Sequence, residues 1–208
     1  MARGLIEGKD AREYAKKVKF SERSKKFDKF ILDNIKLKNS KICDLCCGSG
    51  NTIELLSNKS KEIVGIDASD EMIIICNEKF DKKSNVKIIL SSVTKIKSKE
   101  NYFDYAIVRM GLHHIKDKED VINEIYRILK PKGKLILIDK YHTNKFKYYL
   151  TEIAKLVFKF DKHLLNHFII SKEANLDLLK NFRIIKEEYL SVPQKKTTQT
   201  FMFLLEKK

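Results

Sequence analysis

The chain has 208 residues, 43% of them hydrophobic, and its 43 Lys and Arg residues against 28 Asp and Glu residues give a net charge of +15. This length is sufficient for one sizeable core and short for two domains. The sequence contains no run of roughly 18 apolar residues, so no transmembrane helix is expected. The first residues lack the apolar stretch of a secretory signal. Three of the four cysteines crowd into one short stretch, which is unsuited to a disulfide framework, so we expect a single domain in a reducing compartment, the cytoplasm.

Helical spacing of apolar residues marks the first part of the chain. Residues 10–37 are predicted to form two helices, the second capped by Ser21. We expect both helices to pack on the edge of a sheet, and a lid over a cofactor site is the alternative, which does not exclude the first. The apolar stripes behind this prediction are Ala11, Tyr14 and Val18 in one helix and Phe27, Phe30, Ile31 and Ile35 in the other.

From residue 41 to residue 139, short apolar segments alternate with amphipathic helical segments. Such alternation predicts a parallel, doubly wound sheet with helices on both faces. Residues 91–101 and 111–117 are predicted loops, and Pro131-Lys132-Gly133 is a predicted turn that ends a helix. The predicted strands are 41–45, 62–66, 86–90, 103–109 and 134–138, and the predicted helices are 51–58, 70–82 and 118–129.

The alternation of strands and helices changes after residue 139. Residues 144–168 carry apolar residues at helical spacing with interleaved lysines, which predicts one or two inserted basic amphipathic helices. A helix at 171–181 then precedes two strands, 183–190 and 200–206, which are expected to pair antiparallel because no helix separates them. The predicted fold is therefore α/β and Rossmann-like: a doubly wound, mostly parallel seven-stranded sheet with an antiparallel terminal hairpin.

The turn after the first strand and the end of the second strand carry residues that a nucleotide cofactor needs. Gly48 and Gly50 allow a tight turn against a ligand, and Asp67 is placed to hold a ribose diol with both carboxylate oxygens. Ile53 occupies the position of the third glycine of a dinucleotide fingerprint, and no lysine follows the turn as it does in a P-loop. A diphosphate cradle is therefore poorly supported, and a nicotinamide dehydrogenase is disfavoured.

Four stretches of the chain, in this order, resemble the motifs of class I S-adenosylmethionine (SAM)-dependent methyltransferases. CDLCCGSG resembles the first motif, although Cys46 replaces its usual first glycine, and such a turn is similar to the ubiquinone/menaquinone C-methyltransferase branch. The resemblance implies SAM as the cofactor and a single methyltransferase domain over residues 1–208. The four stretches are 43–50, 63–73, 102–115 and 129–139, and the implied parts are a helical cap (1–38), a cofactor-binding core (41–140), a helical insert over the active site (143–170) and a terminal helix and hairpin (171–208).

The resemblance also implies which residues contact SAM. Ser92 stands where many members have an acid that bonds the adenine amine, so the backbone of Val93 is an alternative contact. Arg109 is a candidate for binding the cofactor carboxylate or the substrate. The implied cofactor-binding residues are Asp44, Cys46, Gly48, Gly50, Asp67, Ala68, Met72, Ser92, Val93 and Arg109.

Candidate catalytic groups follow the predicted fourth and fifth strands, because open α/β sheets bind ligands at the carboxyl ends of their strands. They are His113, His114 and His142, since a histidine titrates near neutral pH, and a base is needed only if the acceptor carries a proton that must leave. Residues 43–46 have C-x-x-C spacing, but no second pair of cysteines accompanies them, so no metal site is expected.

Three functions remain open for the chain. The first is methyl transfer to a small, apolar or ring-containing molecule, with residues 144–168 roofing the site or lying on an anionic membrane surface. The second is methylation of RNA, motivated by the charge of +15, although lysines are spread along the whole chain without a long basic run. The third is a non-catalytic protein that binds SAM or a partner.

Overall fold

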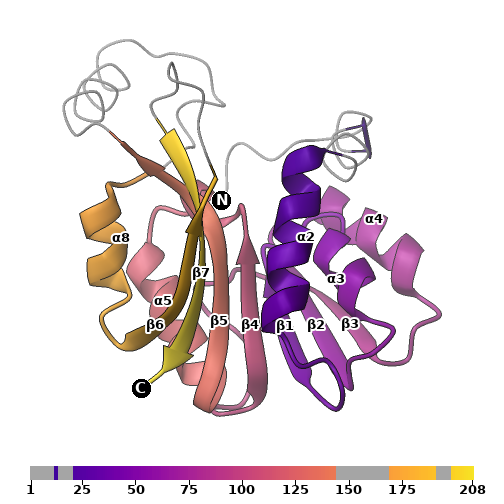
Figure 1. Cartoon of the computed structure of the whole chain (residues 1–208). Helices are drawn as coiled ribbons and strands as arrows, with labels where there is room; N and C mark the ends of the chain where they lie inside the picture. The colour runs from indigo at the N-terminus through magenta and orange to yellow at the C-terminus, as the bar shows by residue number, and fades with distance from the viewer. Residues whose placement is uncertain (1–11, 14–20, 144–168, 191–197) are drawn as a thin grey trace.

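The structure is a computed structural model that describes residues 12–13, 21–143, 169–190 and 198–208. Its strands are β1 (Lys41–Leu45), β2 (Glu62–Asp67), β3 (Val86–Leu90), β4 (Phe103–Arg109), β5 (Leu129–His142), β6 (Phe182–Tyr189) and β7 (Thr198–Lys207). Within the described residues they form a single seven-stranded sheet in the order β3-β2-β1-β4-β5-β7-β6 (Figure 1).

Strand direction confirms the predicted fold class. β1 to β5 pair with one another in parallel, and β7 is antiparallel to both β5 and β6. Because β1 has β2 on one side and β4 on the other, the strand order reverses at β1. The carboxyl end of β1 is therefore the switch point at which open α/β sheets bind their ligands.

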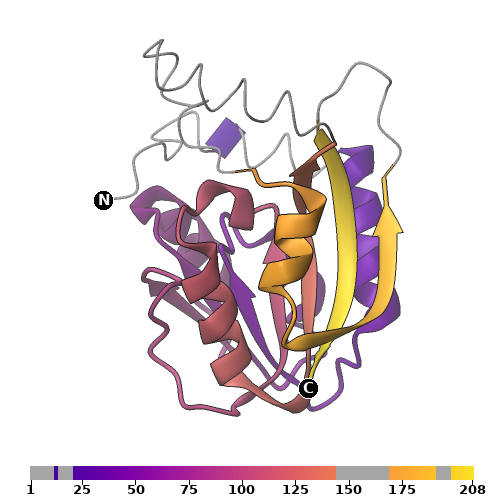
Figure 2. The same cartoon turned by 90° about the vertical axis from the view of Figure 1, so that its left-hand side faces the viewer.

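Helices cover both faces of the sheet. They are α2 (Glu22–Asn34), α3 (Asn51–Leu56), α4 (Asp70–Phe80), α5 (Lys118–Ile128) and α8 (Lys172–Leu178), with a short 3-10 helix η1 (Leu112–His114). Figure 2 shows α5 and α8 on one face, with α2 on the other. As predicted, Ser21 caps α2, since its hydroxyl accepts a hydrogen bond from the Ser24 amide at 3.1 Å.

Two large clusters of buried side chains hold the helices against the sheet. Along β5, Leu135 and Leu137 belong to the cluster that includes the apolar residues of α5, whereas Ile136 and Ile138 belong to the cluster that includes those of α2. Consecutive residues of a strand point to opposite faces, so this alternation places α2 and α5 on opposite sides. Each fully buried aliphatic side chain contributes on the order of 2 kcal/mol to folding.

The structure corrects some of the predicted boundaries. The turn predicted at 131–133 does not separate a helix from a strand, because β5 already begins at Leu129, which pairs with Phe103. Lys132 has a φ of 60° and the pairing of β4 with β5 shifts register there, so the turn persists as an irregularity inside the strand. The loop predicted at 111–117 contains η1, and the predicted inserted helix at 144–168 lies outside the described residues.

Within the part of the chain that the structure describes, no helix is both long enough and apolar enough to cross a membrane.

Candidate functional site

The glycine turn lies at the carboxyl end of β1, between β1 and α3. Gly48 and Gly50 have φ values of 53° and 81°, in a backbone region that residues with a side chain rarely adopt. A Cβ at Gly50 would lie 2.5 Å from a ring carbon of Phe80 and 2.8 Å from the Cys76 sulfur, so glycine lets the turn close against α4. A Cβ at Gly48 would meet nothing within 4 Å. The side of the turn at Gly48 is therefore open to a ligand.

Asp67, at the end of β2, is held beside this turn. Its Oδ2 accepts a hydrogen bond from the Gly48 amide at 2.8 Å, and its Oδ1 accepts one from the Ser69 amide at 2.9 Å. These two bonds fix the orientation of the carboxylate, and each oxygen keeps a lone pair for another donor. The structure thus brings together the turn and the acid that the sequence places 19 residues apart. Ala68 is exposed and Met72 is buried in the first turn of α4.

Asp44 lies one residue before the end of β1 and is almost completely buried, with 1% exposure. Burial raises the pKa of its carboxyl to about 8, against the opposing charge of Arg109, and the nearby Asp67 raises it further. Its Oδ2 has no hydrogen-bond partner among the described residues. Because buried polar atoms are almost always paired, this oxygen points to a missing partner next to the glycine turn.

Cys46, which replaces the usual first glycine of the motif, packs against the end of β4. It has a φ of 56°, and a Cβ at Gly111 would lie only 2.4 Å from the Cys46 Cβ. The absence of a side chain at Gly111 therefore makes room for the cysteine. Burial raises the pKa of the Cys46 thiol well above its usual value, and the nearby carboxylates raise it further. The thiol is thus neutral and fills space, and it is not an activated nucleophile.

The segment after β3 lies next to Asp67, since the Ser91 amide donates to the Asp67 backbone carbonyl at 2.9 Å. Ser92 is exposed, and its hydroxyl lies 2.8 Å from the Thr94 hydroxyl. Val93 is buried, with 6% exposure. The predicted adenine-binding segment is therefore near Asp67, the predicted ribose-binding acid. The Ser92 hydroxyl already has a hydrogen-bond partner in Thr94.

Arg109 has structural partners that the sequence did not indicate. Its guanidinium lies 2.7 Å from the Asp28 carboxylate and 2.5 Å from the Ser24 hydroxyl, and its side chain is 8% exposed. These contacts tie the end of β4 to the first half of α2. A direct contact between Arg109 and the cofactor or substrate stays a prediction.

His113, one of the three candidate histidines, contacts the carboxylate of Asp139 with both its ring and its backbone amide. Its Nδ1 lies 2.6 Å from Oδ1 of Asp139 in β5, and its amide donates to Oδ2 at 3.2 Å. Both side chains are buried. Burial raises the pKa of the Asp139 carboxyl. Attraction to His113 and hydrogen bonds from the His113 ring and from the backbone amides of Lys140 and His113 lower it, and together they leave this pKa below its usual value. The carboxylate therefore stays ionised and orients the ring.

The other two histidines occupy different positions. The exposed His114 ring lies beside the His113 ring, with 4.1 Å between centroids. His142 lies at the end of β5, where its amide donates to the Ile170 carbonyl at 3.1 Å. The pairing of His113 with Asp139 was not predicted. The available indication was that Asp139 directly follows the predicted strand 134–138, just as Asp67 follows the predicted strand 62–66.

Two surface cavities lie away from these residues. One of about 490 Å³ is lined by the start of α5 and by α8, and one of about 280 Å³ lies between the 96–99 loop and the β2–β3 part of the sheet. Neither is lined by a predicted cofactor-binding residue. The candidate site is therefore defined by the glycine turn, Asp44, Asp67 and the pair of His113 and Asp139.

Curated proteins match about half of the chain. The family model described as "Methyltransferase domain" matches residues 43–137. A demethylmenaquinone methyltransferase from Geobacillus sp. (strain WCH70) is 34% identical over 107 residues, which cover 49% of this chain and 46% of that protein. The chain thus spans less than half the length of the curated relatives that it matches.

Solved structures match almost the whole chain. A protein from Pyrococcus horikoshii OT3 is similar with a TM-score of 0.71 at 22% identity, covering 100% of this chain and 95% of that one. Geranyl diphosphate methyltransferase in complex with SAM is similar with a TM-score of 0.74 at 11% identity, covering 89% and 86%. At these identities the likeness concerns the fold alone. Residues 43–137 are therefore similar to the methyltransferase-domain family, and the strand order shows that the chain has the Rossmann-like fold of methyltransferases.

Proposed function

We propose that the chain transfers a methyl group from SAM to a small, apolar or ring-containing molecule. The observation that carries this proposal is the group of polar atoms at the switch point: the oriented Asp67 carboxylate, the open side of Gly48 and the unpartnered Oδ2 of Asp44. The small-molecule acceptor is supported by relatives that are named for demethylmenaquinone, a ring-containing molecule.

The residues present fit SAM. Asp67 would accept hydrogen bonds from the ribose hydroxyls, the 92–93 segment would contact adenine, and Asp44 with the Gly48 turn would face the methionine part. SAM brings an electrophilic methyl group on a positively charged sulfur, so the protein is required to bind, orient and exclude water. The buried, proton-bearing carboxyl of Asp44 offers this site a hydrogen-bond donor at neutral pH.

The acceptor side of the site would be formed by the residues that follow β4 and β5. The Asp139 carboxylate holds Nδ1 of His113 and fixes the orientation of the imidazole. A histidine oriented in this way is suited to take a proton from an acceptor hydroxyl or an activated carbon. For an acceptor without such a proton, the pair would only shape the site.

The test is a methyl-transfer assay with SAM labelled in its methyl group. The protein is incubated separately with a pool of quinones and phenols and with total RNA, and the label is counted in the organic extract and in the RNA. We expect label in the organic extract and its loss in Asp67→Ala. Label confined to RNA would favour the nucleic-acid alternative, and no transfer to either pool despite SAM binding would favour a non-catalytic SAM-binding protein.

A further inference from the structure

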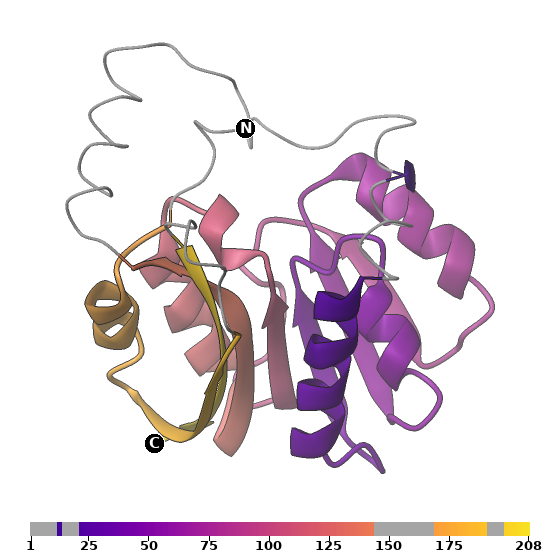
Figure 3. The same ribbon diagram turned by 45° about the horizontal axis from the view of Figure 1, so that its top comes forward.

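Arg109 and Lys140 lie on the neighbouring strands β4 and β5, near the carboxyl end of β4. Ile107 and Ile138 belong to the cluster that includes α2, so Arg109 and Lys140, two residues further along the same strands, point to the same face. Arg109 bonds Ser24 and Asp28, which places the first turns of α2 at this end of the sheet. Figure 3 brings this end of the molecule forward.

The third cation is Arg23, in the first turn of α2. Its guanidinium carbon lies 5.9 Å from the Phe27 ring centroid, and the guanidinium carbon of Arg109 lies 5.5 Å from the same centroid, so Arg23 is at the same end of the sheet as Arg109. The start of a helix also carries a partial positive charge, about half an elementary charge, at its unpaired amides. Arg23 and the amino terminus of α2 therefore both add positive charge on the side of the sheet to which Lys140 points.

The carboxylates nearby are already engaged by other groups. Asp28 pairs with Arg109 at 2.7 Å, and the Asp139 side chain turns to the opposite face, where it holds His113. Lys140 donates its backbone amide to Asp139 at 2.7 Å. Neither the Lys140 ammonium nor the Arg23 guanidinium forms an ion pair or a side-chain hydrogen bond with any residue that the structure describes.

The position of Lys140 is electrostatically unfavourable without an anion. Burial lowers its pKa, Asp139 opposes this effect, and the charge of Arg23 lowers the pKa further. A partly buried ammonium beside a like charge destabilises the fold, and a bound anion would remove this penalty. Functional sites characteristically hold charged groups in such positions.

We propose that Lys140 and Arg23 form a subsite for an anionic group, a carboxylate or a phosphate, on the methyl acceptor. The inference rests on the proposed function, because it places the acceptor between this subsite and the His113–Asp139 pair. It narrows the acceptor to an amphiphilic acid: an apolar or ring-containing body with one anionic substituent.

The test compares ligands that share a ring and differ in charge. Benzoate, phenyl phosphate and the neutral benzamide are titrated into the full chain, with and without SAM, and binding is followed by NMR. We expect at least one of the two anions to bind about tenfold more tightly than benzamide, a difference of about 1.4 kcal/mol. Which anion binds better distinguishes a carboxylate from a phosphate on the acceptor.

Three variants locate the binding of the anion. Lys140→Met is expected to reduce the preference for the anion over benzamide to near unity, and Arg23→Gln to reduce it in part. Lys132→Met removes an exposed lysine from the irregular start of β5 and is expected to leave the preference unchanged. Because Lys140→Met removes an unfavourable charge, we expect it to fold at least as stably as the wild type.

The outcomes separate this inference from the proposed function. Equal binding of anions and benzamide by the wild type, or an equal loss in Lys140→Met and Lys132→Met, would overturn the subsite. Anion binding that depends on Lys140 in a protein that fails to bind SAM would overturn the proposed function and leave an anion site in place.

Discussion

At the scale of single residues, the two glycines of the turn have different tasks, although both have positive φ. Gly50 faces Phe80 and Cys76, so Gly50→Ala adds a steric clash to backbone strain. We expect it to lower the free energy of unfolding by about 2–4 kcal/mol. Gly48 faces open space, so Gly48→Ala is expected to cost about 1 kcal/mol of stability and to weaken SAM binding more strongly. Urea unfolding and SAM titration of both variants check this; equal stabilities would contradict it.

Asp44 gives a pH dependence whose sign follows from its burial. Its pKa rises from 3.8 to about 8 on folding, so between these values the folded state holds a proton that the unfolded state releases. Stability from this group is therefore lost as pH rises, by about 1.4 kcal/mol per pH unit between about pH 5 and pH 7. Asn cannot ionise, so the stability of Asp44→Asn relative to wild type should grow with that slope. A difference that is constant from pH 5 to pH 7 would show that Asp44 ionises normally.

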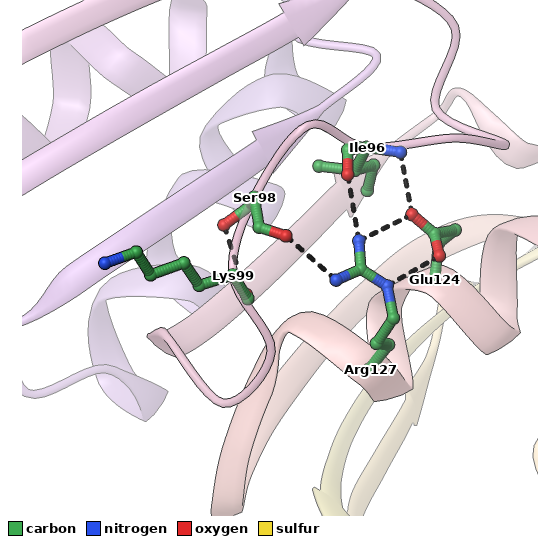
Figure 4. Close-up of polar contacts among 5 residues, drawn as sticks. All are labelled: Ile96, Ser98, Lys99, Glu124 and Arg127. Atoms are coloured by element: carbon green, nitrogen blue, oxygen red, sulfur yellow. Dashed lines mark hydrogen bonds and ion pairs between the residues drawn. The ribbon is translucent and has the colours of Figure 1, made fainter.

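At the scale of elements, an ion pair within α5, between Arg127 and Glu124, forms hydrogen bonds to the backbone of the connection between β3 and β4. Arg127 bonds Glu124 through Nε and Nη2, and it donates to the carbonyls of Ser98 and Ile96, all at 2.8 Å (Figure 4). Glu124 in turn accepts a bond from the Ile96 amide at 2.7 Å, and the Arg127 side chain lowers the pKa of Glu124. The pair of Arg127 and Glu124 therefore holds the backbone of the connection at Ile96 and Ser98 through hydrogen bonds.

We expect Arg127→Ala to cost about 1–3 kcal/mol, because it leaves two loop carbonyls and a partly buried carboxylate without their donor. Hydrogen exchange of the Ile96 amide should speed up more than exchange in β1. The matched control is Arg183→Ala, which removes an arginine that is exposed and paired with Glu206, and for which we expect less than about 1 kcal/mol. Equal costs for the two variants would contradict the role of Arg127 as an anchor.

Sequence reasoning located the strands well and the polar pairs poorly. The strands were found because buried β-strands are continuous apolar segments, and the turn was found because Gly48 and Gly50 suit its positive φ values. The predicted contact of Asp67 with the cofactor stays a prediction. The pairs of Arg109 with Asp28 and of His113 with Asp139 join residues 81 and 26 positions apart, and a single sequence contains no information about which distant charges meet. The start of β5 was misplaced because Pro131 and Gly133 are typical of a turn, whereas pairing of Leu129 with Phe103 extends the strand past them.

At the scale of the whole molecule, helices pack against both faces of the sheet, and the candidate site lies at one end of its strands. The buried clusters around α5 and α2 cover the two faces of the sheet. The carboxyl-terminal parts of four strands, β1, β2, β4 and β5, bring four charged residues to one end of the sheet: Asp44, Asp67, Arg109 and Asp139. The sheet order dictates this convergence, since parallel strands all finish at the same end. The central claim is that SAM binds at this carboxyl end of the sheet.

Calorimetric titration with SAM tests this claim most directly, with NADH as the competing ligand. We expect SAM to bind with a dissociation constant on the order of micromolar and NADH not to bind. Asp67→Ala should weaken SAM binding at least about tenfold, whereas Asp70→Ala, which removes an exposed carboxylate of the same α4 terminus, should not. Circular dichroism of both variants shows that they are folded. Absence of SAM binding by the wild type, or unchanged affinity in a folded Asp67→Ala, would contradict the assignment of this end of the sheet as the cofactor site.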